Sequence, residues 1–296
     1  MAEFVQQLLN GLSLGAIYAL IALGYTMVYG VLRFINFAHS DVFMAGAFLG
    51  YYLARLVPQD SMLGGLAVLA GSMVGCAILG MLIERFAYRP LRGAPTLNVL
   101  ITAIGVSLLL EYTGQVFFGA APRTFPPVFP ERIFTVHGIV ISSSALAVIL
   151  VAGVLMMALQ FIVHRTKIGT AMRALSLNPQ AAQLVGINNN VVISFTFGLG
   201  SALAAAGGIL YALNYPSIDP LMGVMPGLKA FVAAVLGGIG NIPGAALGGL
   251  VLGTVETFVS GSEWSTYKDA IAFAVLILIL LFRPGGLLGK STIEKV

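Results

Sequence analysis

The sequence predicts an all-α protein, a polytopic membrane helix bundle with eight or nine transmembrane segments. Of its 296 residues, 58% are hydrophobic and only 9% are charged, whereas soluble domains carry about 45–50% apolar and about 25% charged residues. Because these few charged groups cannot cover a water-facing surface, most of the exterior must face lipid. The 36 glycines suit closely packed membrane helices. We expect residues 1–296 to form a single transmembrane domain, which contains one longer loop at 164–190.

Eight apolar stretches predict the spans, and one of them is interrupted. The stretch 227–259 is too long for a single crossing of about 20 residues, and Gly240, Pro243 and Gly244 lie inside it. Proline removes a backbone donor and breaks a helix. We therefore expect two half-helices, or two short spans joined by a tight turn, with these three residues as a hinge. The stretches lie at 5–31, 37–56, 62–84, 96–118, 139–163, 191–213, 227–259 and 266–282.

The second stretch begins with polar residues, among them Asn36, His39 and Asp41. Such side chains satisfy the free backbone N–H groups of a helix start, and this is the role we expect. The alternative is a proton relay through His39 and Asp41, because ionisable groups inside membranes tend to be functional.

The distribution of Lys and Arg predicts the orientation. Ten of the 15 basic residues lie near Arg33, at 85–93, at 164–190 and after 282. Because cytoplasmic loops carry the excess of Lys and Arg, we assign these loops to the cytoplasm. The N-terminus then lies outside and the C-terminus inside, which requires an odd number of crossings. Counting 227–259 as two crossings gives nine.

Polar residues within the apolar stretches are candidates for a solute path. A carboxylate in hydrocarbon costs at least about 2.5–3.5 kcal/mol, so such groups should face the bundle interior or water. For Glu111 and Glu256, lining a path and simple hydrogen bonding between helices are equally good interpretations. Glu84 adjoins Arg85 and is expected to pair with it. The candidate path residues are Asn98, Thr102, Glu111 and Glu256.

The sequence contains no recognisable site for a cofactor or for catalysis. The segment 285–292 is similar to a phosphate-binding loop, but Pro284 occupies the place of its first glycine. The histidines His39, His137 and His164 are far apart and predict no metal site. Basic residues sit beside apolar runs rather than on one face, which argues against nucleic-acid binding. We therefore expect no catalytic residue, no metal and no cofactor in this chain, and no nucleic-acid partner.

The predicted cytoplasmic loop 164–190 is too polar for lipid and too regular for a plain linker, although a solvated connector is the alternative. Asn178 and Pro179 are typical of a helix cap followed by proline at the first helical position, and they predict a short helix at 179–185. A second short helix is expected at 170–176. Small residues on both helices favour a docking surface. Its expected members are Gly169, Ala171, Arg173, Ala174, Asn178, Pro179, Ala181, Ala182 and Gly186.

With its GTAMRA, NP and AAQLVGI segments, this loop resembles the coupling loop of bacterial ABC-importer permeases. More narrowly, the chain resembles, over its whole length, the inner-membrane permeases of branched-chain amino acid (leucine, isoleucine and valine) uptake systems. The segments GLSLGAIYALIALGYTMVYGVLRFINFAHSD at 11–41 and FRPGGLLG at 282–289 carry this likeness. One departure is Ser40, where the resemblance leads us to expect glycine.

The resemblance implies a multi-pass permease domain in a bacterial inner membrane, working by alternating access with four partners. These are a second homologous permease, two cytoplasmic ABC ATPases that dock on the loop, and a periplasmic amino-acid-binding protein. ATP and Mg²⁺ would then bind to the ATPases. The implied activity is inward transport of Leu, Ile and Val.

Two other functions stay open. Permeases for urea and short amides resemble this chain closely and would keep the same subunit organisation. An ion-coupled secondary carrier would use Glu111 and Glu256 as ion sites, but it leaves the loop at 164–190 without a role.

Overall fold

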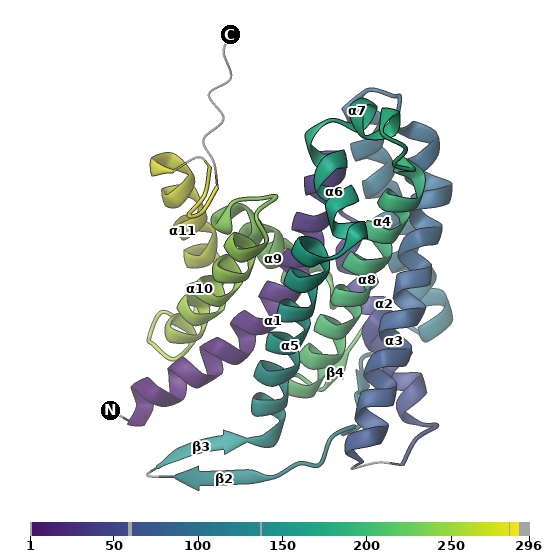
Figure 1. Cartoon of the computed structure of the whole chain (residues 1–296). Helices are drawn as coiled ribbons and strands as arrows, with labels where there is room; N and C mark the ends of the chain where they lie inside the picture. The colour runs from purple at the N-terminus through teal and green to yellow at the C-terminus, as the bar shows by residue number, and fades with distance from the viewer. Residues whose placement is uncertain (1, 59–60, 137, 284, 290–296) are drawn as a thin grey trace.

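The computed structural model describes residues 2–58, 61–136, 138–283 and 285–289, and it is a helix bundle with short strands toward one end (Figure 1). His137, Pro284 and residues 290–296, which include Lys290 and Lys295, lie outside the described residues. The α-helices are α1 (Ala2–Leu32), α2 (His39–Ala54), α3 (Met62–Ile83), α4 (Thr96–Phe118), α5 (Ser143–Arg165), α6 (Lys167–Leu177), α7 (Pro179–Leu184), α8 (Asn189–Asn214), α9 (Val224–Gly237), α10 (Ile242–Ser260) and α11 (Lys268–Phe282). Short π- and 3₁₀-helices are η1 (Glu84–Tyr88), η2 (Arg89–Leu91) and η3 (Ser265–Tyr267).

Seven helical stretches among the described residues are long and apolar enough to cross a membrane, which confirms the predicted polytopic bundle. They are α1, α3 with η1 and η2, α4, α5, α8, α10, and η3 with α11. Helix α1 begins at the end of the bundle that carries the strands, and α11 ends toward the opposite end, which also carries α6 and α7 (Figure 1). The start of α1 and the end of α11 thus lie at opposite ends of the bundle, which is what an odd number of crossings requires.

Helices α1 and α8 form the centre of the bundle. Most of their side chains are buried, including Ile17, Ile21 and Leu23 of α1 and Phe197 and Ile209 of α8. Helices α3, α4, α5 and α11 instead expose apolar side chains along much of their length. An exterior of this kind suits lipid, which confirms the interpretation drawn from composition.

Helices α1 and α10 approach each other through glycine. A Cβ atom on Gly253 would lie 2.3 Å from the Cα of Gly15, and one on Gly249 would lie 2.4 Å from the backbone nitrogen of Ala19. No side chain fits at these contacts. Small residues that let backbones approach are the usual means of association between helices in lipid.

Helices α2 and α9 are shorter than a membrane crossing. Their 16 and 14 residues give lengths of about 24 and 21 Å, against a hydrocarbon thickness of about 30 Å. Their N-terminal ends meet inside the bundle, where Gly223 and Gly227 pack against Ser40. A Cβ on Gly223 would lie 2.2 Å from the carbonyl oxygen of Ser40. The residue at which this chain departs from the resembling family therefore lies at the contact between the two half-length helices.

The expected capping role of the polar residues near the start of α2 is wrong. The residue before the helix is Ala38, which makes no side-chain capping bond. The amide oxygen of Asn36 instead accepts a hydrogen bond from the Tyr88 hydroxyl (2.5 Å), and the Asp41 carboxylate accepts one from the Ser107 hydroxyl (2.5 Å). Because the helix begins among other helices, Asn36 and Asp41 hydrogen-bond to side chains of those helices instead of to the backbone at the helix start.

The predicted interruption of 227–259 is confirmed as a tight turn. Helix α9 ends at Gly237 and α10 begins at Ile242. In the turn, Gly238 and Gly240 have φ values of 104° and 90°, which residues other than glycine rarely adopt. Asn241 then caps α10 by accepting from the backbone N–H of Gly244 (3.1 Å), with Pro243 in the first turn.

Short strands cover the end of the bundle at which α1 begins. Strand β1 (Arg123–Thr124) pairs antiparallel with β4 (Ser217–Ile218), with Arg123 opposite Ile218. Strands β2 (Ile133–Val136) and β3 (Ile139–Ser142) form an antiparallel hairpin that leads into α5 (Figure 1). We call this the hairpin end, and we call the opposite end, which carries α6 and α7, the loop end.

Candidate functional site

The segment 164–190 folds into two helices at the loop end, α6 and α7 (Figure 1). As predicted, Asn178 caps α7 by accepting from the backbone N–H groups of Gln180 (2.9 Å) and Ala181 (3.0 Å), and Pro179 is the first helical residue. Helix α6 is longer than the expected 170–176 because Thr166 caps it earlier, accepting from Gly169 N–H (3.2 Å).

Burial divides the predicted docking residues into two groups. Gly169 and Ala182 are buried, and a Cβ on Gly169 would lie 2.2 Å from the carbonyl oxygen of Ile162, so this glycine permits the close turn between α5 and α6. Ala171 and Ala174 are half-buried. The exposed members are Arg173, Asn178, Pro179, Ala181 and Gly186.

Three apolar residues of this segment, which sequence reasoning missed, are strongly exposed. Leu177, Leu184 and Val185 have exposed fractions of 81%, 89% and 76%. The sequence offered one signal for them: in an otherwise polar loop, Leu177 directly precedes the helix cap Asn178, and Leu184 and Val185 directly precede Gly186. We call these three side chains the apolar tip. Large apolar side chains exposed on a polar segment are a feature of protein–protein contacts.

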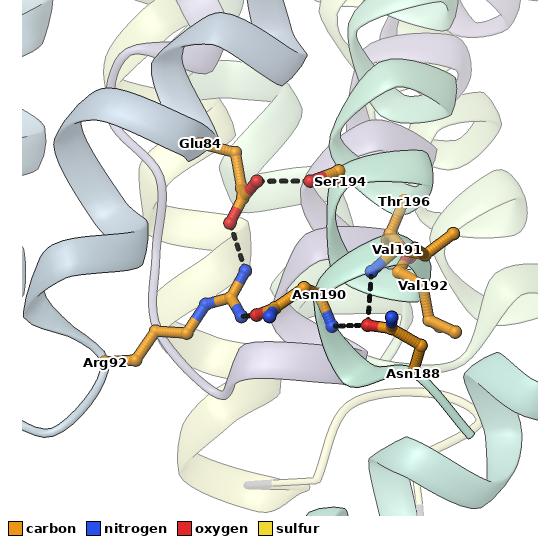
Figure 2. Close-up of polar contacts among 8 residues, drawn as sticks. All are labelled: Glu84, Arg92, Asn188, Asn190, Val191, Val192, Ser194 and Thr196. Carbon is orange, nitrogen blue, oxygen red and sulfur yellow. Dashed lines mark hydrogen bonds and ion pairs between the residues drawn. The ribbon is translucent and has the colours of Figure 1, made fainter. Parts of the chain in front are cut away.

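A buried polar network joins this segment to the end of α3 (Figure 2). The carboxylate of Glu84 is completely buried and accepts hydrogen bonds from Arg92 and from the Ser194 hydroxyl. Arg92 also donates to the side-chain oxygen of Asn190 (2.6 Å). The expected pairing of Glu84 with Arg85 is therefore wrong. Arg85 is exposed, whereas the turn through η1 and η2 carries Arg92 back against Glu84.

The same network reaches the first turn of α8, which directly follows α7. Asn188 caps α8 by accepting from the backbone N–H groups of Asn190 (3.1 Å) and Val191 (3.3 Å), as Figure 2 shows. Arg33, just after α1, donates to the carbonyl oxygen of Ser176 in α6 (3.4 Å). Hydrogen bonds thus tie the end of α1 to α6, and the end of α3 to the start of α8.

The candidate path residues fall into two groups, since three are spread along α4 and Glu256 lies on α10. Asn98 is exposed on α4, and Thr102 donates to its carbonyl oxygen (2.9 Å) within the same helix. Glu111, half-buried on α4, lies close enough to Asp41 to interact with its carboxyl group. Asp41 was missed as a path candidate because its position at a helix start favoured capping.

Glu256 forms the second group and lies in a buried charge network. One of its oxygens lies 2.5 Å from the Lys229 ammonium, and the other accepts from the Tyr18 hydroxyl (2.9 Å). Lys229 also pairs with Asp269 (2.6 Å). This network ties together α1, α9, α10 and α11. Hydrogen bonding between helices, one of the two interpretations offered for Glu256, is therefore present.

Glu256 also borders open space. It lines a cavity of 590 Å³ toward the hairpin end, together with polar side chains of α1, α8 and α10. Among the described residues, no group of three or more His, Cys, Asp or Glu side chains is arranged to hold a metal. Residues 290–292 of the segment that is similar to a phosphate-binding loop are not among the described residues.

Comparison with known proteins identifies the family. The family described as "Branched-chain amino acid transport system / permease component" matches residues 7–280. The chain is 44% identical to the high-affinity branched-chain amino acid transport system permease protein BraD of Pseudomonas aeruginosa, covering 99% of this chain and 98% of the relative. It is 42% identical to the corresponding protein LivH of Escherichia coli, with the same coverage. A more distant relative, 25% identical over 93% of this chain and 84% of its own length, is the ribose import permease protein RbsC of Escherichia coli.

A match of this extent shows the kind of protein to which these helices belong. Permease components are membrane subunits of a larger transporter rather than enzymes. The chain belongs to the branched-chain amino acid transport system permease family, as one multi-pass membrane subunit of an ABC importer.

Proposed function

We propose that this chain forms, with a second homologous permease, the membrane pathway of an importer for Leu, Ile and Val in a bacterial inner membrane. Two relatives with more than 40% identity over nearly the whole chain are named as high-affinity branched-chain amino acid permeases. A periplasmic amino-acid-binding protein would deliver the cargo at the hairpin end. Two cytoplasmic ABC ATPases, which bind ATP and Mg²⁺, would drive transport from the loop end.

The single observation that carries the ATPase assignment is the apolar tip. Leu177, Leu184 and Val185 protrude from helices that lie outside the membrane-crossing stretches. Each large apolar side chain gains about 1.5–3 kcal/mol when it is removed from water. A partner with an apolar groove would therefore bind this surface, and the exposed Arg173, Asn178 and Ala181 would form its polar rim.

Motion of the docked partner would reach the bundle through rigid contacts. Gly169 holds α6 tightly against α5, and the Glu84–Arg92–Asn190 network holds the start of α8 against α3. When ATP closes the ATPase pair, α6 and α7 move with it, and the bundle alternates between outward-facing and inward-facing states. The turn at Gly240, with Pro243 and Gly244 at the start of α10, would act as the hinge.

The cargo rests on sequence likeness rather than on a described pocket. The more distant relative is named as a ribose permease, so proteins that resemble this chain differ in the cargo they transport. Uptake should therefore be measured in proteoliposomes that contain the complete transporter, with ATP supplied at the loop end. We expect uptake of leucine, isoleucine and valine. Uptake of urea or short amides, with none of leucine, would overturn the cargo assignment and leave the ABC organisation intact.

The partner assignment is tested by purifying the chain with its native neighbours in mild detergent and identifying the bound subunits by mass spectrometry. We expect a second permease and two ATPases. Leu184→Asp should weaken ATPase capture by at least about tenfold, as expected for an interface hot spot. Leu56→Asp is the matched control, since Leu56 is 79% exposed and follows α2 at the hairpin end. Equal ATPase capture by both variants, or a clean homo-oligomer that drives uptake with an ion gradient, would overturn the proposal.

A further inference from the structure

A second feature of the loop end is a cavity of 560 Å³ beneath the loop helices. Its lining residues come from the end of α1, from η1 and the connection to α4, from α4, from α6 and from the starts of α7 and α8. Small-molecule sites commonly have volumes of about 300–1,000 Å³. Leu177, Asn178 and Pro179 of the proposed coupling surface also line the cavity, which therefore adjoins that surface.

The charges around the cavity favour an anionic group. Arg33 and Arg92 line it, and no acidic side chain is among its described lining residues. Glu84 offsets the charge of Arg92 from behind, whereas Arg33 makes no ion pair within the described chain. The cavity therefore carries excess positive charge, which suits a carboxylate.

Two buried polar atoms of the lining residues lack partners among the described residues. They are the Nε of Arg92, a donor, and the Oδ1 of Asn189, an acceptor. Buried polar groups in folded proteins are almost always hydrogen-bonded, so each exception calls for an explanation. A ligand with an acceptor for the arginine and a donor for the amide oxygen would satisfy both. An amino acid carries these two groups as its carboxylate and its ammonium.

Aliphatic side chains form much of the remaining wall of the cavity, beside the aromatic Phe34 and Tyr88. Val31, Leu32, Val99, Leu175 and Ile193 line it and come from α1, α4, α6 and α8. Burial of a hydrocarbon side chain against such a wall is favourable in proportion to the area removed from water. A short branched side chain suits this wall, whereas a second charged group would meet no counter-charge among the aliphatic residues.

We propose that this cavity is a binding site for a free aliphatic α-amino acid, entered from the cytoplasm. The assignment rests on the proposed function in one respect, namely that such amino acids are the transported product. A bound amino acid would contact α6 through Leu175, α4 through Val99 and the Glu84 network through Arg92. It would hold the loop helices against the bundle, so accumulated product would slow further import.

The first test uses ligand analogues and needs no variant. The probe is radiolabelled L-leucine, bound at equilibrium to the complete transporter in nanodiscs, without nucleotide and without the periplasmic binding protein. We expect L-leucine to bind, and 4-methylpentanoate, 3-methylbutylamine and glycine each to compete at least about tenfold more weakly, since each lacks one recognised group. Equal competition by all four compounds would overturn the proposal.

The second test places the site in this cavity. Val99→Trp would fill the cavity from α4, and Ile101→Trp is the matched control because Ile101 lies on the same helix, is 59% exposed and does not line the cavity. Thermal unfolding of both complexes confirms that they fold. We expect Val99→Trp to weaken leucine binding at least about tenfold and Ile101→Trp to bind like the wild type. Unchanged binding by a folded Val99→Trp complex would overturn the site.

ATP-driven leucine uptake by the same preparation keeps the two proposals distinguishable. If the transporter takes up leucine, and the Val99→Trp complex binds leucine as tightly as the wild type does, the cavity site is ruled out and the importer function stands. Absence of leucine uptake by an active transporter would remove the cargo assignment, and binding that is lost only in Val99→Trp would still support the cavity site.

Discussion

Arg92 donates a hydrogen bond of 2.6 Å to the side chain of Asn190, although 98 residues separate them in the chain. The same guanidinium pairs with the completely buried carboxylate of Glu84. Through these two contacts, the turn after α3 is fastened to the first turn of α8, at the end of the proposed coupling loop. A short connection at the loop end thus holds the start of α8, the helix that follows α7, against the end of α3.

Removal of the guanidinium should destabilise the protein strongly. Arg92→Leu leaves the Glu84 carboxylate buried and unpaired, which costs about 3–5 kcal/mol. Loss of thermal stability, measured by size-exclusion chromatography after heating, checks this. The double variant Glu84→Gln/Arg92→Leu should recover part of the loss because the buried group is then neutral. Arg85→Leu is the control, and a comparable loss there would contradict the assigned pairing.

The charge network of Lys229 should behave in the same way. Lys229→Met leaves Glu256 with only the Tyr18 hydroxyl as a partner, and we expect a loss of about 3–5 kcal/mol. The melting temperature in detergent measures it. Lys229→Met/Glu256→Gln should restore stability in part, and the exposed Lys268 provides the control Lys268→Met. If the single and double variants melt at the same temperature, Glu256 is not held by Lys229.

The glycine contact between α1 and α10 should not tolerate a methyl group. A Cβ on Gly253 would lie 2.3 Å from backbone atoms of Gly15, so the two helices would have to separate. Overpacking of this kind costs about 1–3 kcal/mol or more. We expect Gly253→Ala to lower the yield of folded protein in fluorescence-detected size-exclusion chromatography. Gly105→Ala is the control, because a Cβ there meets nothing within 4 Å. Equal yields would show that the helices do not need this contact.

Gly169 and Arg173 should separate folding from coupling. Gly169→Ala introduces a Cβ 2.2 Å from a backbone oxygen of α5, so stability should fall by about 1–3 kcal/mol. Arg173 is exposed and makes only local bonds, to the His164 carbonyl (3.5 Å) and the Thr170 hydroxyl (3.3 Å). Arg173→Ala should keep its melting temperature but lower ATP-driven uptake. Normal uptake by an intact Arg173→Ala complex would remove this residue from the docking surface.

Local signals allowed much of the fold to be predicted from the sequence. The helix cap at Asn178, the proline at position 179 and the turn glycine Gly240 act on neighbouring backbone groups, and the structure has them where the sequence predicted. The capping role predicted near Asp41 failed because a helix start inside the bundle meets side chains from other helices. Sequence distance carries no information about such partners.

By itself, the sequence determined that the protein is a membrane helix bundle, since composition sets the preferred solvent and glycine and proline act on their own stretch of backbone. Only the tertiary structure decided which charged groups meet. It paired Glu84 with Arg92 rather than with the adjacent Arg85, because neighbouring residues of a helix point in different directions. It also joined Lys229 to Glu256 and left Leu184 exposed. These outcomes depend on how whole helices pack, and that packing depends on contacts between residues far apart in the chain.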